Sequence, residues 1–205
     1  MGYPESILEL IEYFKKLPGI GEKSAERFAF SIIDFDKDDV ENFANALLSV
    51  SKNIKTCNKC NHITENEICD ICNDNTRDRK TLCVVEDSKS VIKFEKLSVY
   101  NGLYFVLDGL ISPLDKIGPE DINIDRLVDR IKNEEISEVI LAIKPTIEGE
   151  TTSLYILKLL EELNVELNKK IVVSRIAHGI PMGVDMEFID SLTLELAFQD
   201  RKKIS

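Results

Sequence analysis

Four cysteines have the spacing of a metal site. They form two Cys-x-x-Cys pairs, Cys57 with Cys60 and Cys69 with Cys72, with eight residues between the pairs. Paired thiolates on a short loop suit tetrahedral zinc, and four sulfur ligands leave no coordination position for water. The spacing therefore predicts a structural zinc site, which stabilises a segment too small to fold around a hydrophobic core. Free or disulfide-bonded cysteines are the alternative. His62 is surplus to a complete set of four ligands, and we expect it at the surface.

A glycine-rich turn between two predicted helices has the residue types of a phosphate site. Gly19 and Gly21 flank one apolar residue, so the backbone can turn sharply and leave N–H groups bare at the next helix start. Lys23 and Arg27 follow on one face of that helix, where they would flank a phosphate. This pattern predicts a helix-hairpin-helix motif that contacts the DNA backbone without reading sequence. An ordinary helix cap with two solvated cations is the alternative. The neighbouring Glu22 and Glu26 should make binding by one copy weak and salt-sensitive.

Carboxylates follow two of the apolar runs in the second half of the chain. Glu86 directly follows one run, and Glu148 and Glu150 come shortly after another. The carboxyl ends of parallel strands are where α/β sheets place ligands. The arrangement resembles the Toprim domain of topoisomerases and primases. That resemblance implies a strand-end glutamate and an Asp-x-Asp pair that together hold magnesium.

Two positions depart from the Toprim pattern, because Lys144 and Thr146 stand where the two aspartates would be. Magnesium requires oxygen ligands, and an ammonium group adds repulsion where the ion would bind. The sequence therefore predicts that metal-dependent phosphoryl transfer is lost. Two alternatives stay open. One is a magnesium site formed by Glu86 with Asp108, and the other is an active metal-dependent nuclease or primase-like enzyme of the Toprim type.

The spacing of apolar residues changes along the chain, and with it the type of secondary structure that must position these residues. Apolar residues at three- and four-residue steps predict helices over Glu5–Lys16, Glu22–Ile33 and Asp38–Ile54. Short apolar runs typical of buried parallel strands follow at Leu82–Val85, Leu103–Leu107, Val139–Ile143 and Ile171–Ser174. Helical patterns lie between these runs, over Ser88–Leu97, Ile124–Glu134 and Thr152–Leu163. The alternation predicts an α/β fold class with a mostly parallel sheet.

Composition limits the classes of function. The chain has 205 residues, 43% of them apolar, and a formal net charge of −11. So acidic a chain is not a strong free-standing nucleic-acid binder, and DNA binding would require a local basic surface or several subunits. No apolar run reaches the length of a membrane span, and the N-terminus has no signal pattern. We therefore expect a cytoplasmic protein with no membrane partner, in which disulfides are unusual. Cys83 is expected to be a buried hydrophobic residue.

Together, the hairpin, the four-cysteine loop and the degenerate Toprim domain resemble the bacterial recombination protein RecR family over essentially the whole chain. The stretches that carry the resemblance are Leu17–Gly21, Arg27–Ala29, Cys69–Cys72, Cys83–Glu86, Ser112–Asp115, Ile117–Asp121, Pro145–Glu150 and Arg175–Pro181. Their order divides the chain into a helix-hairpin-helix module (1–55), a four-cysteine zinc finger (56–80), a Toprim domain (81–176) and a short C-terminal extension (177–205).

This resemblance implies a non-catalytic DNA clamp that acts in DNA repair. Proteins of this family act with RecO-type and RecF-type partners at single-stranded gaps and junctions with duplex DNA, where they help the RecA recombinase replace single-strand-binding protein. They form homodimers that pair into a tetrameric ring large enough to encircle DNA. Because they act on DNA, the resemblance also implies association with the nucleoid. The matching DNA contacts here are Gly19, Gly21, Lys23 and Arg27, and the matching partner-facing residues are Glu86, Glu148 and Glu150. A zinc scaffold that binds only proteins is a further alternative.

Overall fold

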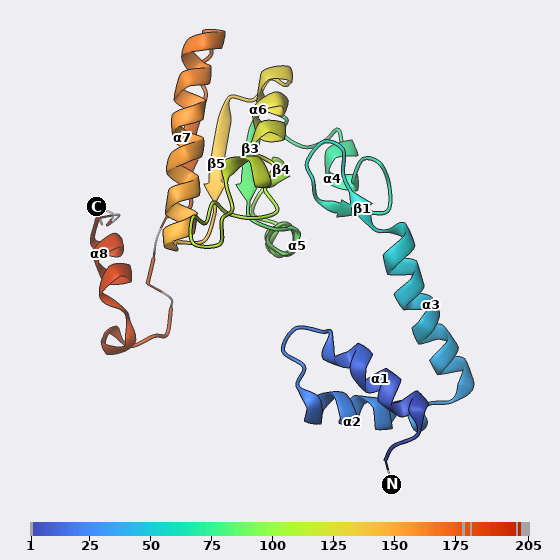
Figure 1. Ribbon diagram of the computed structural model, residues 1–205. Coiled ribbons are helices and arrows are strands. Elements are labelled where there is room, and N and C mark those ends of the chain that lie inside the picture. The colour runs from blue at the N-terminus through green and yellow to red at the C-terminus, as the bar shows by residue number, and fades with distance from the viewer. Residues whose placement is uncertain (1, 178, 181, 200, 202–205) are drawn as a thin grey trace. The chain divides into compact units, whose positions relative to one another are not determined.

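The computed structural model describes residues 2–177, 179–180, 182–199 and 201 (Figure 1). The chain divides into two compact units between Ile54 and Lys55. His178 and Pro181, which belong to the stretch Arg175–Pro181, lie outside the described residues. Within the described part of the chain, no helix is both long and apolar enough to cross a membrane.

The first unit consists of three helices, α1 (Glu5–Lys15), α2 (Glu22–Ile33) and α3 (Lys37–Asn53). α1 and α2 pack together through Ile11, Ala25 and Ala29, which are buried. The two alanines carry no side chain beyond Cβ, so the two helices can approach closely along this face. Asp36 caps α3 by accepting a hydrogen bond from the Asp39 N–H (2.8 Å). The structure describes every residue of α3, and none of them is buried. The three helices confirm the sequence prediction to within one residue at each end.

The second unit is built on a four-stranded parallel sheet of order β4-β3-β5-β6. Its strands are β3 (Thr81–Val85), β4 (Leu103–Val106), β5 (Glu138–Ala142) and β6 (Val172–Arg175). Three helices connect and cover them: α5 (Ser88–Leu97), α6 (Ile124–Asn133) and α7 (Ile147–Leu167). The predicted parallel sheet and its α/β alternation are therefore confirmed.

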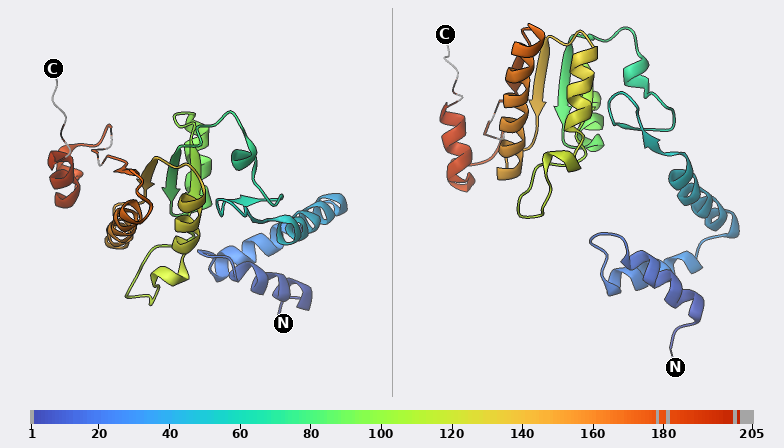
Figure 2. Two further views of the ribbon diagram at one scale, coloured as in Figure 1. Left: turned by 90° about the horizontal axis from the view of Figure 1, so that it is seen from above. Right: turned by 45° about the horizontal axis from the view of Figure 1, so that its top comes forward.

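Alternate residues of each strand point to opposite faces, and each face has its own core. Leu82, Val84 and Phe105 face α6 and α7 in the larger cluster of buried residues. Cys83 and Val106 face α5 in the smaller cluster. Figure 2 shows α6 and α7 on one side of the sheet and α5 on the other. Because both faces are covered, the strands are nearly continuous apolar runs, which is why the sequence identified them.

Helix α7 is longer than predicted at both ends. It begins at Ile147, five residues before the predicted Thr152, and the Thr146 hydroxyl caps it by accepting from the Gly149 N–H (3.2 Å). The predicted start was wrong because the first turn of α7 is polar and carries no apolar period. A glycine is required in this turn, since a Cβ at position 149 would lie 1.9 Å from the Lys144 carbonyl oxygen. Glu148 and Glu150 therefore belong to a helix N-terminus and not to a loop.

Short elements that the sequence did not reveal complete the second unit. The four-cysteine segment contains the antiparallel pair β1 (Lys55–Thr56) and β2 (Ile63–Thr64), followed by the single turn α4 (Asp70–Asn73). The turn η1 (Pro119–Asp121) precedes α6. After β6 come η2 (Met186–Phe188) and α8 (Ser191–Gln199). Apart from α8, these pieces are too short to produce a periodic apolar pattern.

Candidate functional site

The four predicted metal ligands lie together in the second unit. Their sulfur atoms all lie within 4.8 Å of one another, and all four cysteines are buried. All four thiols are free, so the disulfide alternative does not describe this cluster. A tetrahedral zinc ion with Zn–S bonds of about 2.3 Å requires sulfur atoms about 3.8 Å apart. The donor set and its spacing therefore fit a zinc ion.

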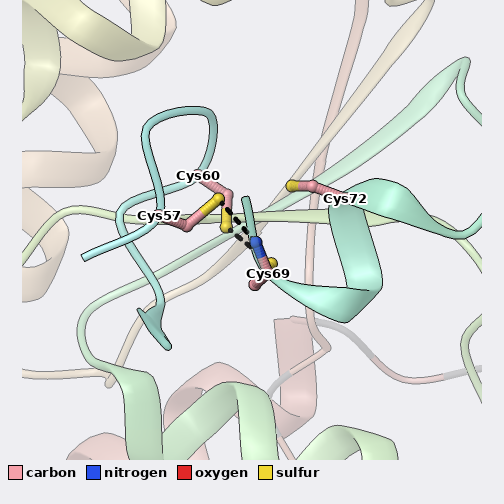
Figure 3. Close-up of side chains that lie close together, drawn as sticks. All are labelled: Cys57, Cys60, Cys69 and Cys72. Carbon is pink, nitrogen blue, oxygen red and sulfur yellow. Dashed lines mark hydrogen bonds between the residues drawn. The ribbon is translucent and has the colours of Figure 1, made fainter. Parts of the chain in front are cut away.

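Two local structures hold the cysteines in this arrangement (Figure 3). Cys57 and Cys60 lie on the β1–β2 turn, where the Cys57 N–H donates to the His62 carbonyl (2.8 Å). Cys69 precedes α4 and Cys72 lies within it. The pairs approach each other directly, since Cys60 Sγ lies 3.5 Å from Cys69 Sγ and the Cys69 N–H donates to Cys57 Sγ (3.3 Å). Such an N–H···S bond stabilises the thiolate form that a metal requires.

His62 is not a surface residue, contrary to the sequence prediction. Its side chain is half-buried, and this burial lowers the pKa of His62 against the opposing charges of Cys69 and Glu95. The reason is that the β1–β2 turn packs onto the rest of the second unit, which covers a residue that a free loop would expose. Cys83 is buried in the sheet as predicted, and burial raises the pKa of its thiol to about 12.

The predicted phosphate-binding turn adopts the expected local geometry in the first unit. Gly19 has φ +79°, a conformation that disfavours other residues, and Gly21 is the N-cap of α2. Lys23 and Arg27 are both exposed on α2. Among the described residues, neither of them forms an ion pair with a carboxylate, and the Arg27 guanidinium lies 5.3 Å from the Phe28 ring centre. The turn therefore presents a helix N-terminus and two available cations.

A lysine on α1 changes the expected electrostatics of this turn. Lys15 Nζ lies 2.7 Å from Glu22 Oε2 and 2.8 Å from Glu12 Oε1. Hydrogen bonding to these two carboxylates raises the pKa of Lys15. The sequence predicted that Glu22 would oppose the DNA-binding cations. In the structure Glu22 pairs with Lys15, which it shares with Glu12, so the negative charge of Glu22 is partly offset beside the turn.

The predicted acidic residues gather at the carboxyl end of the sheet. Glu86 follows β3, and Glu148 and Glu150 lie in the first turn of α7. Hydrogen bonding from its own N–H and from the Thr146 hydroxyl lowers the pKa of Glu148. Glu150 Oε2 lies 3.3 Å from Arg175 Nη1 of β6. We call these three carboxylates with their basic partners the acidic rim.

Lys144 forms an ion pair within the acidic rim. Its Nζ donates to Glu86 Oε1 at 2.8 Å, and this hydrogen bond raises the pKa of Lys144. The Asp108 N–H donates to the Glu86 carbonyl (2.9 Å), so the Glu86 and Asp108 backbones are adjacent, as the sequence suggested. A cavity of about 600 Å³ opens beside the pair, lined by Glu86, Lys144 and residues of the C-terminal segment such as Ile176 and Thr193. The lysine ammonium thus already neutralises the carboxylate that would bind magnesium.

Two arginines beside the cysteine cluster were not identified from the sequence. Arg126 and Arg130 lie four residues apart on α6, and both donate to the four-cysteine segment. The only sequence signal was this spacing, which is also typical of a solvated helix face. In the folded chain both arginines instead belong to the immediate surroundings of the cysteine cluster.

Comparisons with known proteins match every part of the chain. Four family models match in order: RecR helix-hairpin-helix (residues 7–50), RecR four-cysteine zinc finger domain (54–74), Toprim domain (80–177) and RecR C-terminal (179–202). Proteins named Recombination protein RecR from Staphylococcus aureus strain Newman and Staphylococcus haemolyticus strain JCSC1435 are each 50% identical over 204 residues, covering 100% of both chains. Identity at this level over the full length leaves no segment of the chain unmatched. The chain therefore belongs to the RecR family of recombination proteins.

Proposed function

We propose that this protein is a recombination mediator in DNA repair, a non-catalytic DNA clamp that helps load a RecA-type recombinase at single-stranded gaps. The observation that carries the proposal is the 50% sequence identity, over 204 residues, to proteins named Recombination protein RecR. The family models also match four segments in order. Its proposed partners are RecO-type and RecF-type proteins and gapped DNA. This function places the protein in the cytoplasm, at the nucleoid.

A reconstituted loading reaction tests this proposal. Gapped DNA coated with single-strand-binding protein is mixed with the recombinase and a RecO-type partner, with and without this chain, and recombinase assembly is followed over time. We expect assembly to accelerate when chain and partner are both present, and neither Mg²⁺ nor Mn²⁺ to induce strand cleavage. Metal-dependent nicking of gapped or supercoiled DNA that is lost in Glu86→Gln would overturn the non-catalytic assignment in favour of the Toprim enzyme.

Three of the four segments have a proposed role. We assign DNA contact to the helix-hairpin-helix module (1–55), structural support to the zinc finger (56–80) and partner contact to the Toprim domain (81–176), and we assign no role to the C-terminal extension (177–205). The proposed zinc ligands are Cys57, Cys60, Cys69 and Cys72. Bound zinc would supply four metal–sulfur bonds that crosslink the β1–β2 turn to α4. The proposed DNA contacts are Gly19, Gly21, Lys23 and Arg27.

An oligomer would reconcile DNA binding with the acidic composition. One turn with two cations binds DNA weakly, but several copies held around one duplex gain avidity without any new contact. The exposed apolar residues of α3 support a homodimer that pairs into a tetrameric ring. Four of them, with Ile54 at the C-cap, recur at alternating three- and four-residue steps: Val40, Phe43, Leu47, Val50 and Ile54. A stripe of this kind is normally covered by another helix.

The acidic rim is the proposed contact for a basic partner protein. Glu86 and Glu150 are paired with Lys144 and Arg175, whereas Glu148 has a lowered pKa and lies at a helix N-terminus. We therefore expect Glu148 to contribute most to attraction of a partner. We expect the two ion pairs to hold the side chains of Glu86 and Glu150 in place.

The ion pair between Lys144 and Glu86 yields a prediction about magnesium. Lys144→Asp replaces the ammonium by a carboxylate facing Glu86, which creates the two-carboxylate environment that magnesium binds. We expect a Mg²⁺-dependent rise in melting temperature and a measurable binding heat in the variant, and neither in the wild type. Lys158→Asp, an exposed change of the same charge on α7, is the control. Equal Mg²⁺ binding by wild type and variant would contradict this account and restore the enzyme alternative.

A further inference from the structure

The outer edge of strand β4 is covered by the four-cysteine segment. β4 ends the sheet on one side, so the backbone groups of Tyr104 and Val106 that point away from β3 have no neighbouring strand. Instead, the Val106 N–H donates to the Cys60 carbonyl (2.8 Å), and the Val106 carbonyl accepts from Asn61 Nδ2 (3.3 Å). An uncovered edge strand is a template for pairing with another chain. The position of the cysteine cluster therefore matters to the sheet as well as to the segment itself.

Arg130 completes this cover and reaches the cluster from α6. Its side chain is only 5% exposed. Its Nη1 donates to the Tyr104 carbonyl (2.8 Å) and to the Lys59 carbonyl (3.4 Å), and its Nη2 lies 4.0 Å from Cys72 Sγ. Its Nε pairs with Glu134 Oε2 at 3.1 Å. A buried guanidinium is tolerated only when its N–H groups are satisfied, and here one planar group contacts the sheet edge, the β1–β2 turn and a metal ligand together.

Arg126, one turn earlier on α6, contacts the other cysteine pair. Its guanidinium donates to the carbonyls of Cys57 (3.4 Å) and Asn58 (3.1 Å) and to Asn61 Oδ1 (2.9 Å). Asn61 directly follows Cys60 and has φ +61°, so the hydrogen bond from Arg126 to its side chain helps hold the chain in this left-handed conformation beside the first cysteine pair. The two arginines therefore hold both halves of the cluster from a single helix face.

We infer that Arg130 is a positioning residue of the zinc site, which holds the cluster against the edge of β4 and offsets the charge of its thiolates. This inference rests on the proposed zinc site. Four thiolates around a divalent ion leave an excess of negative charge, and a guanidinium within reach of Cys72 Sγ reduces it without displacing a ligand. Because the same guanidinium binds the Tyr104 carbonyl, movement of the zinc site and exposure of the sheet edge are coupled.

The rate at which zinc leaves the protein tests the inference. Purified full-length chain is assayed for bound zinc by elemental analysis, and zinc transfer to a chromophoric chelator in excess is then timed. Removal of the groups that orient metal ligands typically costs 10- to 100-fold in metal affinity. We expect Arg130→Gln to retain one zinc per chain and to release it at least about 10-fold faster. Arg130→Lys keeps the charge but not the planar fork, so its rate should lie between those of wild type and Arg130→Gln.

Lys132→Gln is the matched control, because it removes one positive charge from an exposed position two residues away on α6. It should release zinc at the wild-type rate. Arg126→Gln is measured as well, and if Arg130→Gln does not fold, a several-fold faster zinc release in Arg126→Gln still supports a role of the α6 arginines in holding the zinc site. A wild-type release rate in folded Arg130→Gln, or in Arg126→Gln where Arg130→Gln does not fold, would overturn the inference while leaving the zinc site intact. Purified wild type without zinc would instead show that the proposed zinc site is wrong.

Discussion

Cys57→Ser is expected to abolish stoichiometric zinc binding and to unfold the four-cysteine segment. The apparent free energy of zinc binding in small four-ligand sites is about 10–16 kcal/mol, and much of it is folding free energy. A serine hydroxyl does not replace a thiolate as a zinc ligand, and Cys57 also accepts the Cys69 N–H. Zinc content by elemental analysis should fall from one per chain towards zero, and the melting temperature should fall with it. DNA binding should be lost only as a consequence.

Cys83→Ala is the control for this prediction. Cys83 is a buried thiol outside the cluster, with a pKa raised to about 12. It is therefore a neutral side chain in the sheet, and its substitution should reduce stability slightly while leaving one zinc per chain. Chelation of the wild type should reproduce the Cys57→Ser result. Full zinc content in Cys57→Ser would contradict the assignment of the four ligands.

The second large effect is expected at the glycine-rich turn. The double substitution Lys23→Ala with Arg27→Ala removes both exposed cations from α2, so binding to gapped DNA in the presence of a RecO-type partner should fall at least about 10-fold. Removal of each phosphate-binding cation should also reduce the dependence of log K on log salt by about 0.9. The measurement is a series of binding isotherms at several salt concentrations. Both side chains are exposed, so zinc content and melting temperature should remain unchanged.

Lys52→Ala, measured beside the single variants Lys23→Ala and Arg27→Ala, provides the charge-matched comparison. It removes a cation from the last turn of α3, in the same unit but away from the turn. If it weakens binding as much as the α2 substitutions do, general charge accounts for the effect. If the double variant binds gapped DNA like the wild type, the turn is structural and the protein-only zinc scaffold becomes the better description.

The metal cluster could be predicted from the sequence because its chemistry is local. Four cysteines within 16 residues determine a ligand set whatever the surrounding fold. The parallel sheet was predictable for a different reason, since strands covered on both faces must be apolar throughout. Lys144 was also singled out from the sequence as a charge opposed to magnesium, whereas its direct bond to Glu86 required the structure.

The contacts between distant segments could not be predicted. Arg130 meets Cys72 and Tyr104 only because α6 packs beside the edge of β4, and nothing in the sequence near Arg130 distinguishes it from a solvated residue. The start of α7 was missed because it depends on a threonine cap and on a glycine that avoids Lys144. Pairing of Glu22 with Lys15 likewise depends on the return of the chain from α1 to α2.

The contact between Arg130 and the cysteine cluster has a consequence for synthesis of the protein. Arg130 lies 58 residues after Cys72, so all four cysteines leave the ribosome well before the helix that holds them. At elongation rates of about 5–20 residues per second, the interval is roughly 3–12 seconds. During that time the nascent thiols have no Arg130 guanidinium beside them. On the inference above, zinc captured by the nascent chain is retained firmly only once α6 has been synthesised.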